Sequence, residues 1–213
     1  MLAKVYGAPQ LNKLDSIDML LASLAADSID TTDFNTVFSK ALQTHLSDLV
    51  SFNDSPVDQN LWERVARPQV TEQLCGMKMR AAVKVDFVEL IRTFAGHVLV
   101  NSLLGREVLE EFPTALSDLS ELSSGWKWLA TGLPTFLPVP PLTRVVIARR
   151  RLLNMLQDLC HNLDLQADGK QLEAPWRDLS DVSALVWTKN AMWRKERLPV
   201  KVRASAILAI VSK

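Results

Sequence analysis

The sequence is poor in several residue types, and each scarcity excludes a class of protein. Two cysteines in 213 residues are too few for a secreted domain held together by disulfides, so a reducing compartment is the default. The 24 basic and 24 acidic side chains cancel. The chain therefore lacks the excess of positive charge that a general nucleic-acid binder needs, and we expect no nucleic-acid partner.

Long uninterrupted apolar runs are also missing. The opening stretch, "MLAKVYGAPQ", has no continuous apolar core of the kind a signal peptide carries. The longest apolar stretch, 93–105, is interrupted by His97 and Asn101 and is shorter than a bilayer span. With no anchor in view, the sequence leaves the localisation open between the cytoplasm and the surface of a membrane.

Helical patterns account for most of what is present. Seven glycines, one tyrosine and few alternating stretches give little sign of strands, whereas apolar residues recur at helical spacing. We expect a mainly helical, all-α fold in one domain over 1–213. Three helices are predicted by range: 61–75, with a kink or split at Pro68, then 85–104 and 181–197. Four more are predicted by where they begin: near Phe34, near Pro113, after Pro141 and near Lys201.

Apolar stripes predict which faces of these helices are buried. The segment 85–104 is apolar nearly all round, which is typical of a helix in a protein interior. The helix after Pro141 carries Leu142, Val145, Leu152, Leu156, Leu159 and Leu163 on its stripe, and the preceding helix carries Leu116, Leu119, Leu122, Trp126 and Leu129. The six tryptophans are spread over at least four elements, so we interpret most of them as packing residues rather than as a binding cage.

Motifs that carry chemistry are absent from the sequence. It has no glycine-rich phosphate loop, no nucleophile elbow and no cysteine pair at zinc spacing, so no catalytic residue and no metal ligand are assigned. The three histidines lie far apart, and His97 is predicted to be a hydrogen-bonded core residue. Arg144, Arg149, Arg150 and Arg151 form a basic surface patch. It is either a site for anions or a membrane surface, or the solvated face of an amphipathic helix, and the second reading is favoured.

Several segments follow, in order, the pattern of one family. The first is "GWKWLATGLPTFLPVPPLTRVVIARRRLL", which is similar to the stretch that joins the F and G helices in the fungal cytochrome P-450 monooxygenases. "LIRTFAGHVLVNSLLGREVLEEFP" resembles the E helix and the entrance to the F helix, and "PWRDLSDVSALVWTKNAMWRKERLPVKVRAS" the H-helix region and the opening of the I helix. "KVYGAPQ" is similar to the segment before the C helix. The resemblance is collinear from about Val5 to Leu208.

The resemblance implies a chemistry and a setting. The family binds haem and uses O2 and electrons from an NADPH-dependent reductase to oxidise hydrophobic small molecules, in fungi often secondary metabolites, at the endoplasmic reticulum membrane. The Pro-rich segment 132–141 would be the F–G loop, and its apolar residues Leu133, Phe136, Leu137 and Val139 would border the substrate entrance or face the membrane. Equally, these side chains could pack beneath the loop as a small cluster of their own.

The sequence departs from the family where the chemistry resides. The family's haem ligand is a cysteine thiolate in the pattern Phe-x-x-Gly-x-x-x-Cys-x-Gly, and neither Cys75 nor Cys160 lies in such a pattern. Glu89 and Arg92 match the spacing of the K-helix pair but lie far too early. We therefore expect a truncated member, without the N-terminal sheet, the oxygen-handling residues of the I helix and the haem-thiolate part, and without activity of its own. The alternative is a non-catalytic helical interaction protein or a degenerate gene product.

Overall fold

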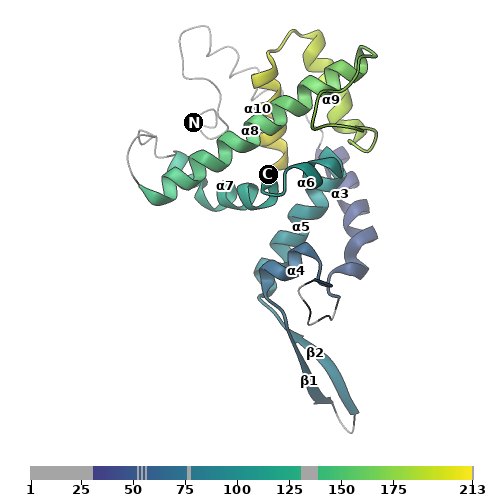
Figure 1. Ribbon diagram of the computed structural model, residues 1–213, viewed down its shortest axis with the longest axis vertical. Coiled ribbons are helices and arrows are strands. Elements are labelled where there is room, and N and C mark those ends of the chain that lie inside the picture. Colours follow the sequence, from purple (N-terminus) through teal and green to yellow (C-terminus); the bar gives the residue numbers. More distant parts are fainter. Residues whose placement is uncertain are drawn as a thin grey trace. The chain divides into compact units, whose positions relative to one another are not determined.

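The computed structural model describes residues 31–51, 53, 55, 57–75, 78–130 and 139–212 (Figure 1). The chain forms two compact units. The small unit is Phe38–Leu99, and the large unit contains Val100–Lys213 together with the chain up to Val37. Each unit has a hydrophobic core of its own.

Helices make up most of the described chain, which confirms the predicted mainly helical class. They are α3 (Thr31–His45), a short 3-10 helix (Leu46–Asp48), α4 (Leu61–Ala66), α5 (Phe87–Leu104), α6 (Glu107–Glu111), α7 (Ala115–Ala130), α8 (Pro140–Ala167), α9 (Ala184–Lys195) and α10 (Val200–Val211). Two strands, β1 (Gln69–Cys75) and β2 (Lys78–Lys84), form one antiparallel pair beside these helices, and the described chain is mainly α.

The small unit is built around Trp62. Its ring lies 5.2 Å from that of Phe94 in an edge-on arrangement, and its indole N–H donates to the Leu49 carbonyl oxygen at 3.0 Å. Leu90 and Val98 complete the buried cluster with Ala66. Aromatic pairs of this geometry add to the free energy that their buried area supplies. The core of this unit therefore consists of one face of α5 against the short α4.

The hairpin β1–β2 corrects the helix predicted over 61–75. Helix α4 ends at Ala66, Arg67 has a left-handed φ of 49°, and Pro68 cannot continue a helix. Strand β1 then pairs with β2 from Gln69 opposite Lys84 to Cys75 opposite Lys78. The proline is thus a boundary between two kinds of structure rather than a kink within one helix.

Helix α5 has the length and apolar composition of a membrane span, with 18 residues and a mean hydropathy of 1.3. It is the one such helix in the described part of the chain, and length and composition alone do not separate a span from a core helix. Leu90, Phe94 and Val98 are buried on α5, whereas Phe87 and Val88 in its first turn are 66% and 64% exposed. The predicted burial of this segment is confirmed for one face only.

Helices α7 and α8 of the large unit form an antiparallel pair (Figure 1). Gly125 lies against Val145, and Asp118 lies 3.7 Å from Arg151, so the two helices run in opposite directions. All six stripe residues predicted for α8 are buried, which confirms that stripe. On α7, Leu122 and Leu129 are buried, but Trp126 is 49% exposed, so its predicted burial is wrong.

Helix α10 lies in the interior of the large unit and packs mainly on α8. Every residue from Val202 to Val211 is buried, including Arg203 and Ser205. A helix that is buried on all sides needs partners for its polar groups. The Ser205 hydroxyl donates to the Lys201 carbonyl oxygen at 2.8 Å, and the Arg203 guanidinium donates to side chains of α8 and α9.

The segment between α8 and α9 is tied to the start of the large unit by acidic side chains and one serine. The Glu107 carboxylate accepts from the backbone N–H groups of Arg177 and Asp178, and Asp181 accepts from the N–H of Arg106 at 2.7 Å. Ser183 caps α9 and also donates its hydroxyl to the Leu103 carbonyl oxygen. These bonds join residues about 70–80 positions apart in sequence.

The close contact of α7 with α8 predicts that no side chain larger than that of glycine fits at position 125 without strain. A Cβ atom there would overlap a Val145 methyl group and lie 3.2 Å from the Val145 Cβ. We expect Gly125→Ala to lower the free energy of unfolding by about 1–2 kcal/mol, because overpacking costs ~1–3 kcal/mol and exceeds the ~1 kcal/mol that alanine gains in a helix. Urea unfolding measures the change.

Ser123→Ala on the exposed side of α7 is the matched control. It should change the free energy of unfolding by less than ~0.5 kcal/mol. An increase in stability for Gly125→Ala would contradict the packing of α7 on α8.

Candidate functional site

A buried polar cluster joins α8, α9 and α10. The Arg203 guanidinium donates to both carboxylate oxygens of Asp164, at 2.9 and 2.7 Å, and to the amide oxygen of Asn190 at 2.8 Å. The Asn190 amide nitrogen donates in turn to Asp164 at 3.1 Å. Arg203 and Asn190 are each 3% exposed. Each helix contributes one side chain, so the cluster fixes the positions of all three helices.

The charge of Asp164 is stabilised by its neighbours. Burial tends to raise the pKa of this carboxyl group, but the hydrogen bonds and charge of Arg203, with Asn190 and Arg194, outweigh burial and lower the pKa below its ordinary value of 3.8. One donor of the cluster, Arg203 Nε, has no hydrogen-bond partner in the described part of the chain. Because its pKa is lowered, the Asp164 carboxyl group is ionised at neutral pH.

A groove opens beside this cluster, between the end of α8 and α9. It encloses about 370 Å³ and is lined by Leu163, Asp164, Ala167, Trp187, Asn190, Ala191, Arg194 and Lys195. At its rim the Arg194 guanidinium binds the Asp168 carboxylate at 2.8 and 2.9 Å. The groove thus has an apolar lining and a charged edge.

Cys160 lies one helical turn before Asp164 and is fully buried on α8. Burial raises the pKa of its thiol to about 12, and the nearby Arg203 only partly offsets this rise. A haem-thiolate centre needs an ionised sulfur that reaches the iron. Cys160 is a neutral packing side chain and does not fit that role.

Within the described ranges no group of three or more His, Cys, Asp or Glu side chains gathers closely enough to hold a metal ion. Cys75 lies at the end of β1, and its side chain is outside the described part of the structure. The expectation that the haem ligand is missing stays an expectation for the chain as a whole.

The predicted entrance loop falls mostly outside the described residues. This applies to Leu133, Phe136 and Leu137, whereas Val139 is half-buried just before α8. The four arginines lie on α8. Successive residues of a helix differ by about 100°, so Arg144 and Arg151 share one edge while Arg149 and Arg150 point elsewhere. Arg149 is half-buried, which lowers its pKa, and the other three are exposed.

Three large apolar side chains are exposed near the loop end of the α7–α8 pair, and one of them, Trp126, belongs to the stripe that was predicted to be buried. Trp126 and Trp128 on α7 are 49% and 39% exposed, and Ile147 on α8 is 45% exposed. All three lie within one helical turn of the contact between Gly125 and Val145. The one available sequence signal was "GWKW", two tryptophans that cannot both lie on a single buried stripe.

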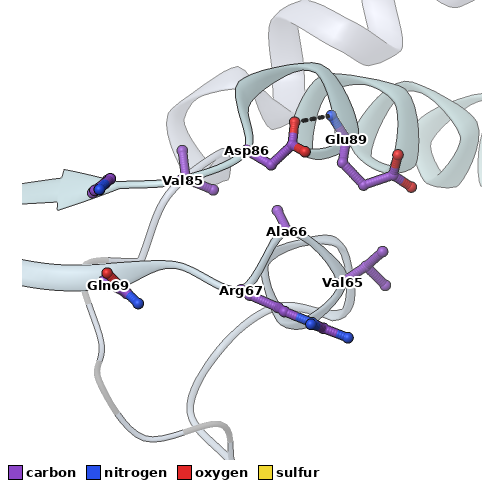
Figure 2. A pocket seen from close by; sticks show the side chains of 8 residues that line it. Val65, Ala66, Arg67, Gln69, Val85, Asp86 and Glu89 are labelled. Carbon is purple, nitrogen blue, oxygen red and sulfur yellow. Dashed lines mark hydrogen bonds between the residues drawn. The ribbon is translucent and has the colours of Figure 1, made fainter.

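The small unit has a second hollow, of about 610 Å³, between the end of α4, the ends of the hairpin and the start of α5 (Figure 2). Val65, Ala66 and Arg67 lie on one side of it, opposite Asp86 and Glu89. The Asp86 carboxylate accepts from the Glu89 backbone N–H at 3.1 Å and so caps α5. The Asp86 carboxylate in this hollow is thus occupied in capping α5, and the lining residues do not place a nucleophile next to a base.

His97 differs in part from its predicted role. Its ring is half-buried against Trp62, with centroids 4.9 Å apart, but its Nδ1 has no hydrogen-bond partner among the described residues. Burial, followed by the charge of His45, lowers its pKa, so the ring is neutral at pH 7. It packs as a neutral ring against Trp62, and the predicted hydrogen bond is not made by its Nδ1.

Comparisons with known proteins add no identification to this geometry. No profile of a known protein family, no curated protein and no solved structure matches the chain.

The buried ion pair predicts a particular pattern of stability. Asp164→Leu leaves Arg203 with Asn190 as its only described partner, so we expect the free energy of unfolding to fall by ~3–5 kcal/mol. The double variant Asp164→Leu with Arg203→Met removes both charges and should lose less than the single variant. Urea unfolding at neutral pH measures both, and strictly additive losses would contradict direct coupling.

The same pair predicts the sign of a pH dependence. Because the folded state lowers the pKa of Asp164 below 3.8, the contribution of the pair is complete above that value and is lost as the pH falls through the folded-state pKa. The Asp164→Leu protein should therefore lose less stability than the wild type on acidification below pH 3.8. Parallel acid-unfolding curves for the two proteins would contradict this assignment.

Proposed function

We propose that the chain is the central helical part of a cytochrome P-450-like monooxygenase and that it does not oxidise substrates by itself. The observation that carries the proposal is the position of the Pro-rich motif. It lies between α7 and α8, two antiparallel helices in contact, as the resemblance to the F and G helices requires. The E-like segment lies on α5, and the H-like and I-like segments supply α9 and α10.

Further support comes from the character of individual helices. Helix α8, with 28 residues, is the longest described element of the large unit. It packs on both α7 and α10. Helix α10 is buried over almost its whole length, as the opening of a central helix would be. An experimental structure in which α7 and α8 were not adjacent would remove the main support for the family proposal.

The proposal assigns no catalytic step to the described residues. In this family, haem supplies O2 activation when it is bound through a thiolate. The Cys160 thiol is buried and neutral, so this side chain does not fit that group. Hydrophobic substrates and a reductase partner are thus properties of the proposed family as a whole. For this chain we propose only the helical part of that fold.

A carbon-monoxide difference spectrum tests the proposed lack of activity. We expect the reduced, haemin-treated chain to show no thiolate-type Soret band, because a thiol with a pKa near 12 is ionised about a thousandfold less than one with its ordinary pKa of 9.0. Single variants Cys160→Ser and Cys75→Ser are measured alongside. A thiolate-type band that disappears in either variant would identify a ligand and overturn the proposed inactivity.

A non-catalytic role at a membrane surface is the second candidate function. It rests on the exposed Trp126, Trp128 and Ile147 and on the exposed Arg144, which is the neighbour in sequence of Val145 at the contact with Gly125. Tryptophan is favoured at the level of lipid headgroups, and arginine is attracted to anionic lipids. These side chains gather at the end of the α7–α8 pair that leads into the Pro-rich segment.

Vesicle sedimentation tests this second role. We expect the chain to bind vesicles that contain phosphatidylserine, and the double variant Trp126→Ser, Trp128→Ser to bind at least about tenfold more weakly, since burying each indole stabilises the bound state by roughly 1–2 kcal/mol. Phe87→Ser is the matched control, because Phe87 is 66% exposed but lies in the small unit. Equal binding by the double variant and the wild type would rule out this surface.

A further inference from the structure

The groove between α8 and α9 is shaped by residue size. Ala167 and Ala191 leave space where larger side chains would close it, and Leu163 and Trp187 supply apolar walls. The Trp187 ring is fixed because its N–H points to the Leu179 carbonyl oxygen at 3.4 Å. With about 370 Å³, the groove lies at the small end of ligand sites in proteins.

The two carboxylates at the groove have ion-pair partners, whereas one of the basic side chains has none among the described residues. The Asp164 carboxylate is bound by Arg203 and Asn190, and Asp168 is bound by Arg194 and lies 3.6 Å from Lys170. Lys195 lines the groove, is exposed and makes no ion pair with any residue that the structure describes. The acidic groups at this site are thus compensated, while one ammonium group at the rim is available.

We propose that this groove binds a small organic anion with a flat apolar body, such as an aromatic carboxylate. The body lies against the partly exposed Trp187, in the space left by the two alanines, and the carboxylate faces the Lys195 ammonium. Arg194, 40% exposed at the same rim, adds positive potential without leaving Asp168. This inference is independent of the proposed monooxygenase family.

The local chemistry favours an anion over other small ligands. A cationic ligand would meet Lys195 and Arg194, while both carboxylates that could hold it are already bound to guanidinium groups. A neutral polar ligand would lose hydrogen bonds to water against a mostly apolar lining. Apolar contact and one charge are the two interactions that the groove offers.

Isothermal titration calorimetry with naphthylacetate and its neutral analogue naphthylacetamide tests the proposal. We expect the wild-type chain to bind naphthylacetate about fivefold more tightly than the amide, since an exposed charge pair contributes up to ~1 kcal/mol. Lys195→Gln should remove this difference by weakening the anion alone. Ala191→Trp, at an exposed position, should abolish binding of both probes by filling the groove.

Lys127→Gln, a change at an exposed lysine on α7, is the matched control and should leave both affinities unchanged. Thermal unfolding of each variant separates loss of the groove from loss of the fold, and Lys195→Gln keeps the test valid if Ala191→Trp does not fold. The proposal is overturned by absence of binding, by equal affinity of wild type for the two probes, or by unchanged binding in both groove variants.

Discussion

The ion pair of Arg203 with Asp164 is the constraint on which the large unit depends. A guanidinium group that is 3% exposed requires a partner, since an unpaired charge in a protein interior is strongly unfavourable. Asp164 on α8 supplies two oxygens and Asn190 on α9 supplies one, so α10 enters the core only where both neighbours are in position. A buried pair of this kind selects one arrangement of helices more than it increases stability over an apolar core.

Some elements could be predicted because their signals are local. The stripe on α8 extends over several turns, so its burial followed from spacing alone, and Pro140 lies at the start of that helix as its restricted φ allows. The hairpin was missed because its strands are seven residues each and lack a clear alternation between apolar and polar residues. Pro68 indicated a break, but a proline is compatible with either a new helix or a strand after it.

Other features arise only when distant segments meet. Asp164, Asn190 and Arg203 are separated by 26 and 13 positions, and each looks like an ordinary polar residue of an amphipathic helix. The groove beside them depends on alanines in two helices, which no single-helix pattern reveals. Trp126 was predicted to be buried because it continues the stripe of α7. It is exposed because α8 covers that stripe only in part, leaving this indole at its margin.

The described residues support candidate binding surfaces rather than a candidate catalytic centre. Among the described residues there is no cluster that could hold a metal ion, and Cys160, the one cysteine whose side chain is described, is a packing residue with a neutral thiol. They do offer two surfaces in the large unit, a tryptophan- and arginine-bearing end of the α7–α8 pair and an apolar groove with a basic rim. Helical scaffolds commonly carry binding functions in this form, and the fold alone does not decide between them.

Helix α8 also connects these two surfaces through one continuous helix. Arg144 and Asp164 are twenty residues apart on an unbroken helix, which corresponds to a rod of about 30 Å. The close fit of Gly125 against Val145 fixes the register of α7 on this rod near one end. Near the other end, the two hydrogen bonds from Arg203 to Asp164 fix the register of α10, so one unbroken helix sets the position of both neighbours.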